Sequence, residues 1–284
     1  MPDSQTFSVL GLSISAQRWH AGAAIPVIAL HGWLDNSESF SVIAQSMPEV
    51  DLVALDMAGH GLSDHRALHA NYLIWDDLRE ILAVADTLGW ERFALLGHSR
   101  GAIVAALLAA ACPERVTALG LLDGLWAQTR DELKAPTQLA RALGCRLPQQ
   151  PPEIFASLAD MVELRMRSSF PIEHAAAQAL VRRNAVESAE GWQWRSDPRL
   201  KWPSMLMLTP GQESAFHRAI QCPVELLLAE KGLIMAYPDY AARLELLPAI
   251  NWSIAAGGHH FHMENAAAGF GEHLSRFFSG VPAV

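Results

Sequence analysis

A single serine lies between two glycines in the stretch Gly97-His98-Ser99-Arg100-Gly101, where an apolar run ends and an alanine-rich segment begins. A tight strand-to-helix turn leaves no room for a Cβ atom two residues before or after its central residue, and glycine at both places removes that obstacle. The turn exposes the hydroxyl of Ser99 and aims the first amides of the following helix at charge developing beside it. These residue types at this spacing indicate a nucleophilic serine.

A nucleophilic serine needs a general base, and three histidines follow the last expected strand in Gly257-Gly258-His259-His260-Phe261-His262. A loop histidine at that place can reach back over a sheet to Ser99, but composition alone does not choose among His259, His260 and His262. Histidines two residues apart also bind zinc. However, no carboxylate stands at the spacing that a metallohydrolase uses, so we expect no metal.

Acyl transfer also needs two hydrogen-bond donors for the negative oxygen of the tetrahedral intermediate. The apolar run 26–30 leads into His31-Gly32-Trp33, which places backbone N–H groups at the carboxyl edge of a sheet. We expect the N–H groups of Trp33 and Arg100 to form this oxyanion hole. For His31 we expect a structural hydrogen bond to a neighbouring loop rather than proton transfer.

The elements that position these residues alternate between strand-like and helical patterns. The sequence predicts strands over residues 12–19, 26–30, 52–55, 92–96, 116–122, 224–228 and 252–255. It predicts helices over residues 39–46, 72–88, 102–112, 235–247 and 264–278. Short apolar strands separated by helices are typical of a mostly parallel sheet covered on both faces. From residue 124 to about 220 only helical segments are evident, which indicates a helical insertion.

Composition narrows the class of protein. The chain has 284 residues, half of them hydrophobic, and a formal charge of -9, which argues against nucleic acid or an anionic membrane as a partner. Three widely spaced cysteines suggest a reducing compartment. No secretory signal is evident, and the longest apolar run, residues 102–112, is too short to span a bilayer. We therefore expect a soluble cytoplasmic protein of undetermined oligomeric state.

Taken together, four stretches resemble the α/β-hydrolase fold: HGWLD, the run DMAGHGLSD at residues 56–64, GHSRG and GGHHFHMEN. Within that superfamily the chain is most similar to the serine hydrolase-like proteins, through HGWLDNSESF, DPRLKWPS and GGHHFHME. The resemblance implies a core of residues 1–123 and 221–284. It also implies a helical cap, residues 124–220, inserted after strand 6 of that fold, which corresponds to the run 116–122, the fifth of the strands predicted above.

The resemblance also implies that His259, which directly follows a glycine and lies three residues before His262, is the base. Members of this superfamily commonly place the third catalytic residue, an aspartate, at a position that is Gly232 here. A glycine cannot orient an imidazole, so another acid is needed. Asp123, which ends the strand 116–122, is favoured over Glu230, which stands two residues short of the usual place.

These features predict a serine hydrolase that cleaves a small or medium carboxylic ester with Ser99, His259 and Asp123 and without a cofactor. We expect His98 and Trp126 to contact the substrate. A serine nucleophile excludes the haloalkane dehalogenase and epoxide hydrolase chemistries of this fold, which use aspartate. Two alternatives remain: hydrolysis of a C–C bond or lactone by the same residues, and a ligand-binding protein with little catalysis.

Overall fold

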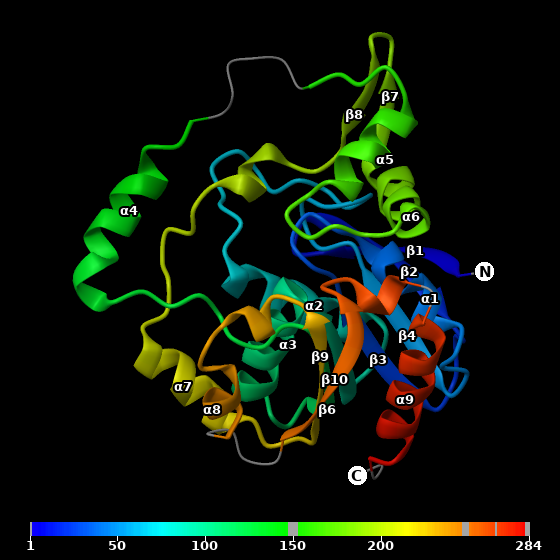
Figure 1. Ribbon diagram of the computed structural model, residues 1–284, viewed down its shortest axis with the longest axis vertical. Coiled ribbons are helices and arrows are strands. Elements are labelled where there is room, and N and C mark those ends of the chain that lie inside the picture. The colour runs from blue at the N-terminus through cyan, green and yellow to red at the C-terminus, as the bar shows by residue number, and fades with distance from the viewer. Residues whose placement is uncertain (1, 147–152, 246–249, 265, 282–284) are drawn as a thin grey trace.

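An eight-stranded sheet runs through the centre of the molecule in the order β1-β2-β4-β3-β5-β6-β9-β10 (Figure 1). The computed structural model describes residues 2–146, 153–245, 250–264 and 266–281, so parts of the helices predicted over 235–247 and 264–278 lie outside the described residues. The strands are β1 (Asp3–Val9), β2 (Leu12–Trp19), β3 (Ile25–Leu30), β4 (Val50–Leu55), β5 (Phe93–His98), β6 (Val116–Leu122), β9 (Val224–Lys231) and β10 (Ile250–Gly258). From β4 to β10 neighbouring strands are parallel, whereas β1 and β2 are antiparallel additions at one edge.

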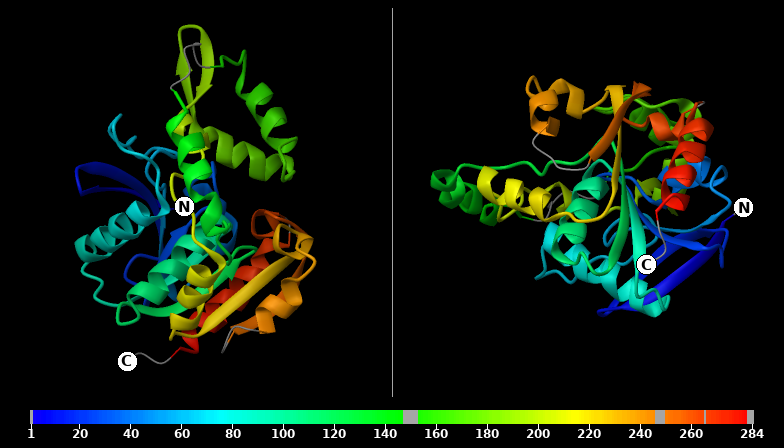
Figure 2. Two further views of the ribbon diagram at one scale, coloured as in Figure 1. Left: turned by 90° about the vertical axis from the view of Figure 1, so that its left-hand side faces the viewer. Right: turned by 90° about the horizontal axis from the view of Figure 1, so that it is seen from below.

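Helices cover both faces of this sheet, as the alternating pattern predicted (Figure 2). On one face α1 and α9 pack together, and Ile43 and Leu274 are among their buried residues. On the other face α2 contributes Ile81, Val84 and Ala85, which recur at helical spacing, and α3 packs beside it. The bounds of these helices are α1 (Ser41–Ala44), α2 (Ile74–Thr87), α3 (Arg100–Ala111), α7 (Pro210–Ala219), α8 (Tyr240–Glu245) and α9 (Ala267–Ser279).

The central strands are buried along their whole length, which explains their continuous apolar sequences. Strands β2 and β6 have the predicted bounds, and every other predicted strand is present with slightly different ends. The sequence did not predict β1, because its residues DSQTFSV are mostly polar and exposed. The α8 helix begins at Tyr240, five residues later than predicted.

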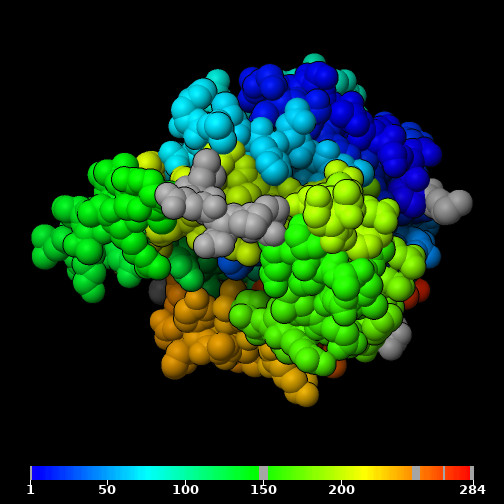
Figure 3. All heavy atoms as spheres, turned by 90° about the horizontal axis from the view of Figure 1, so that it is seen from above, coloured from blue at the N-terminus to red at the C-terminus, as the bar shows by residue number. Residues whose placement is uncertain are grey.

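The segment between β6 and β9, which contains the predicted cap, is not entirely helical. It contains α4 (Ala135–Leu143), α5 (Leu158–Met166) and α6 (His174–Asn184), followed by an antiparallel hairpin of β7 (Ala185–Ser188) and β8 (Gly191–Trp194). The hairpin differs from the predicted helical insertion. In the space-filling view α4 projects from one side, whereas α5, α6 and the hairpin form a separate mass (Figure 3).

Two further observations bear on the organisation of the chain. Although α7 falls within the range predicted for the cap, it packs against α3 and so belongs with the helices that cover the sheet. Among the described residues, every helix is too short or too polar to cross a lipid bilayer.

Candidate active site

Ser99 lies between the end of β5 and the first residue of α3, in a backbone conformation that few side chains adopt. Its φ of 52° and ψ of -116° fall in a region that glycine favours. The flanking glycines permit this turn, because a Cβ atom at Gly97 would overlap the backbone of Ala102, and one at Gly101 would overlap the carbonyl oxygen of Leu30. The structure thus has the tight strand-to-helix turn that the GHSRG pattern predicted.

Two hydrogen bonds join Ser99, His259 and Asp123 into a chain. The hydroxyl of Ser99 lies 2.9 Å from Nε2 of His259, and Nδ1 of the same ring lies 2.5 Å from Oδ2 of Asp123. Asp123 is fully buried and His259 is 4% exposed. With Nδ1–H donated to the carboxylate, Nε2 has a free lone pair for the serine proton, which is the tautomer that a general base requires.

The carboxylate of Asp123 is fixed from several directions. It accepts hydrogen bonds from the backbone N–H groups of Ala229 and Leu233, at 3.2 Å and 2.7 Å. Its own backbone has a φ of 40° and donates to Leu227 in β9. Glu230, the alternative acid, is exposed near the end of β9, and its carboxylate has no recorded bond to His259 within the described chain.

The proposed oxyanion donors come from the loop after β3 and from the first turn of α3, which are in contact. A side chain at Gly101 would collide with the carbonyl groups of Leu30 and His31, so the first turn of α3 lies directly against the loop after β3. This contact brings the segments that contain the N–H groups of Arg100 and Trp33 together. His31 has the structural role expected of it: Nδ1–H donates to Gly32, and Nε2 accepts from the N–H of Met57.

The side chain of Arg100 is mostly buried and forms an ion pair. Its guanidinium donates to Asp77 of α2 at 2.6 Å, and Asp77 also accepts from Arg66. Arg66 in turn bonds Glu80. Arg100, the residue after Ser99, is therefore one end of a largely buried charge network, which the sequence alone did not reveal.

His98 lies behind His259. It is completely buried, and its Nε2–H donates to the carbonyl oxygen of His259 at 2.9 Å. Its ring centroid is 4.7 Å from that of His259. This placement differs from the predicted contact with substrate and favours a role in holding the backbone of His259.

Two other histidines of the loop have separate partners. His260 lies 3.0 Å from Oδ2 of Asp35, and His262 hydrogen-bonds the hydroxyl of Ser39 at 2.9 Å. Burial is the largest cause that lowers the pKa of His98, His260 and His262, so these rings are neutral at pH 7. Neither His260 nor His262 hydrogen-bonds Ser99 among the described contacts, which leaves His259 as the histidine that the structure brings to the serine.

Asp35, His98 and His260 present ligand-type atoms within 4.8 Å of one another. Positive charge is already supplied there by Arg165 of α5, whose guanidinium donates to Oδ1 of Asp35 at 2.9 Å. Burial by itself would raise the pKa of Asp35, but His260 and Arg165 hold it well below its ordinary value. We interpret this cluster as an ion pair between cap and core.

The sequence did not indicate that Phe170 belongs to the site, although its ring centroid lies 4.3 Å from that of His259. Phe170 occupies the irregular segment between α5 and α6, where no periodicity marks a residue as functional. Trp126 is half-buried, and the guanidinium of Arg243 lies 4.2 Å from the centre of its ring. Its predicted contact with substrate stays a prediction.

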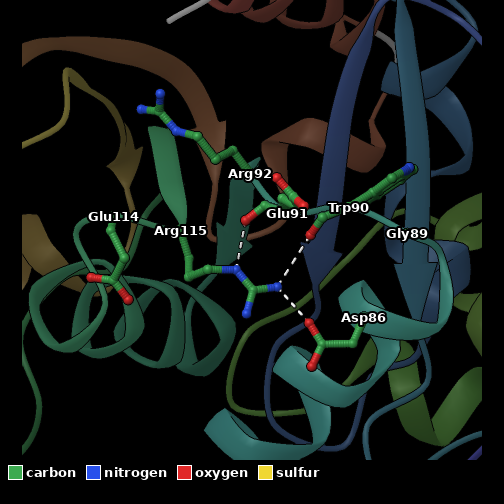
Figure 4. Close-up of a pocket in the computed structure, with 7 residues that line it drawn as sticks. All are labelled: Asp86, Gly89, Trp90, Glu91, Arg92, Glu114 and Arg115. Carbon is green, nitrogen blue, oxygen red and sulfur yellow. Dashed lines mark hydrogen bonds and ion pairs between the residues drawn. The ribbon is translucent and has the colours of Figure 1, made fainter.

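A separate pocket lies at the opposite edge of the sheet (Figure 4). Its residues precede β5 and β6, whereas Ser99 follows β5, so it is separated from the serine by the length of that strand, about 20 Å. Arg115 spans this pocket and donates to Asp86 and to the carbonyl groups of Glu91 and Trp90. These bonds indicate a structural clamp.

Comparison with known proteins identifies the family of the chain. The model of the family described as the alpha/beta hydrolase fold matches residues 25–266. A serine hydrolase-like protein of Dictyostelium discoideum is 30% identical over 91% of this chain and 76% of its own length. Serine hydrolase-like protein 2 of Homo sapiens is 31% identical over 82% of this chain and 77% of its own length.

One solved structure extends the likeness to three dimensions. The crystal structure of the hypothetical protein PA1622 from Pseudomonas aeruginosa PAO1 superimposes with a TM-score of 0.94, at 43% identity over 98% of this chain and 99% of that one. The predicted fold and the predicted resemblance are thereby confirmed. The chain belongs to the α/β-hydrolase fold family and, within it, to the serine hydrolase-like proteins.

Proposed function

We propose that the protein is a carboxylesterase that acts on a small or medium ester through an acyl-Ser99 intermediate. The observation that supports this most directly is the continuous hydrogen-bond chain from Ser99 through His259 to the buried Asp123. Membership of a family of hydrolases makes hydrolysis the expected reaction, and the serine at the turn makes acyl transfer its form.

In the first half of the reaction, Oγ of Ser99 attacks the ester carbonyl carbon while its proton moves to Nε2 of His259. The carboxylate of Asp123 stabilises the resulting imidazolium. The carbonyl oxygen becomes negatively charged and accepts hydrogen bonds from the N–H groups of Trp33 and Arg100. The intermediate then collapses, the C–O bond to the alcohol breaks, and His259 returns the proton to the departing oxygen.

In the second half, a water molecule takes the place of the alcohol. His259 removes one of its protons as the water oxygen attacks the acyl carbon, and the same donors hold the oxyanion. Collapse breaks the bond to Oγ of Ser99, which recovers its proton from His259, and the carboxylic acid leaves.

The surroundings of His259 support its role as the single base. The neighbouring His98, His260 and His262 are buried and have lowered pKa values, so they do not compete for the proton at neutral pH. The alternative of a ligand-binding protein rested on the glycine at position 232. A carboxylate from Asp123 at hydrogen-bond distance from His259 removes that reason.

Intact mass after exposure to a fluorophosphonate probe tests the proposal. We expect one adduct on the native chain and none on Ser99→Ala. In a separate assay, the native chain should hydrolyse p-nitrophenyl esters. A folded native chain that forms no adduct would contradict the proposal and would favour the alternative of a ligand-binding protein. A panel of lactones and C–C substrates separates ester hydrolysis from those two reactions.

A further inference from the structure

Phe170, in the segment between α5 and α6, packs against His259, the base of the proposed reaction. Its ring lies against one face of the His259 imidazole, with centroids 4.3 Å apart and planes tilted by 37°. On the same imidazole the ring of His98 lies at 4.7 Å. The imidazole of His259 therefore contacts both His98 of β5 and Phe170 of the α5–α6 segment, and its Nε2 lies beside the hydroxyl of Ser99.

The segment that contains Phe170 is fixed by Arg165 at the end of α5. One guanidinium nitrogen of Arg165 donates to Ser168 at 2.7 Å and to the carbonyl oxygen of Phe170 at 3.4 Å. The hydroxyl of Ser168 also donates to that carbonyl, at 3.0 Å. Within this short segment, therefore, one cation organises the backbone that presents the phenyl ring.

Arg165 is itself anchored to the core. Its second terminal nitrogen donates to Oδ1 of Asp35 at 2.9 Å and lies 3.1 Å from His260. Asp35 is buried and remains ionised, since its partners hold its pKa well below the ordinary value. A buried, charge-assisted bond of this kind holds its geometry better than an exposed pair. Arg165 therefore joins Phe170 to the loop after β3 and to the residue next to His259.

The position of Phe170 has a chemical meaning if the proposed function holds. In the proposed reaction the departing alcohol oxygen receives its proton from Nε2 of His259, so the alcohol group of the ester lies beside that imidazole. Phe170 presents an apolar ring against the same imidazole.

We propose that Phe170 forms the apolar wall of the subsite for the alcohol group of the ester, and that Arg165 positions it through Asp35. The substrate class that follows is an ester of an apolar, bulky alcohol. This inference rests on the proposed esterase function, and it assigns alcohol selectivity to the α5–α6 segment rather than to Trp126.

Two ester series test the inference on the full chain. One keeps the acyl group as butyrate and varies the alcohol from methyl to n-butyl to benzyl. The other keeps the alcohol and lengthens the acyl group. The variants are Phe170→Ala, Phe170→Tyr and Arg165→Met. The matched control is Arg167→Met, because Arg167 lies two residues further on, its side chain is 80% exposed, and it pairs only with the exposed Glu163 among the described residues.

We expect Phe170→Ala to lower kcat/KM for the benzyl ester by at least about tenfold more than for the methyl ester. The loss should appear mainly in KM, and Phe170→Tyr should restore the preference. Arg165→Met should shift the alcohol preference in the same direction, and Arg167→Met should leave it unchanged. None of these variants should change the order of rates along the acyl series.

An equal loss for all alcohols, or a change confined to the acyl series, would overturn the inference while the esterase function stands. If Arg165→Met fails to fold, Phe170→Ala still decides the question. A native chain that neither reacts with the fluorophosphonate probe nor cleaves any ester would overturn the proposed function, and the inference with it.

Discussion

Gly232 lies so close to Asp123 that a Cβ atom at position 232 would overlap the aspartate carboxylate. Position 232 is where hydrolases of this fold commonly place the acid, and Asp123 lies at the end of the neighbouring strand β6. The two positions therefore offer a carboxylate to the same point beside His259, one at a time. The absence of a side chain at 232 is what makes room for the acid from β6.

The identity of the acid is tested by removing its charge. Asp123→Asn should lower kcat by a factor of about 10³–10⁴, because the amide cannot hold His259 in the required tautomer or stabilise its cation. Glu230→Gln should change kcat by no more than a few-fold, since Glu230 is exposed. Steady-state kinetics on a p-nitrophenyl ester measures both, and the reverse pattern would make Glu230 the acid.

A methyl group at position 232 should damage activity without removing any polar group. Gly232→Ala forces the carboxylate of Asp123 to move, and we expect kcat to fall by at least about tenfold, with about 1–3 kcal/mol lost from the free energy of unfolding. Gly269→Ala is the control, because open space surrounds that helical glycine, and alanine there should stabilise α9 slightly. Equal behaviour of the two variants would show that Asp123 is not confined.

The strain at Ser99 predicts an unusual ranking of variants. Glycine adopts a φ of 52° and a ψ of -116° without the steric cost that alanine meets. Ser99→Gly should therefore be more stable than Ser99→Ala by about 1 kcal/mol, although both are inactive. Urea unfolding monitored by tryptophan fluorescence measures the difference, and a more stable Ser99→Ala would show that the turn is relaxed.

A second buried ion pair fixes the cap to the core. Arg183 of α6 donates to both oxygens of Asp56, which is fully buried, at 2.9 Å and 3.0 Å. Arg183→Met leaves this carboxylate without its cation and should cost about 3–5 kcal/mol of the free energy of unfolding. The exposed control Arg167→Met should cost less than about 1 kcal/mol. A similar small loss for both would mean that water replaces the Arg183 contact.

Glu80 makes stability depend on pH near neutrality. Burial raises the pKa of Glu80 to about 7, against the opposing effect of Arg66. Because the folded state then binds a proton that the unfolded state releases at lower pH, stability should fall as the pH rises from about 4.5 to 7. Glu80→Gln should flatten this part of the curve of Tm against pH. An unchanged slope in the variant would assign the dependence to another group.

The sequence predicted the tight turn at Ser99 because such a turn leaves no room for side chains at positions 97 and 101, and both residues are glycine. It predicted the sheet because buried strands are continuously apolar. It did not choose among His259, His260 and His262 without the family resemblance, since all three are buried and only distance separates them. Asp123 was favoured over Glu230 because of its place at the end of a strand, whereas the positive φ of 40° at Asp123 is marked by no residue pattern.

The cap was harder to predict than the core. Each strand of the β7–β8 hairpin has only four residues and is only partly buried, so the alternation of apolar and polar residues along it is weak. Phe170 and Arg165 act through contacts with residues more than 80 positions away in the chain, namely His259, His260 and Asp35. Local periodicity contains no information on such contacts. Only the assembled fold shows that they meet.

The order of the site residues along the chain, with His259 after all the others, has a consequence for synthesis on the ribosome. Asp35, His98, Ser99, Asp123 and Arg165 all precede β10, and the base arrives only with the loop that follows this edge strand. Because chains fold progressively from the N-terminus, a nascent chain can form the turn at Ser99 while it still lacks a proton acceptor. In the proposed mechanism, the serine therefore stays unreactive until β10 and the loop that follows it have folded.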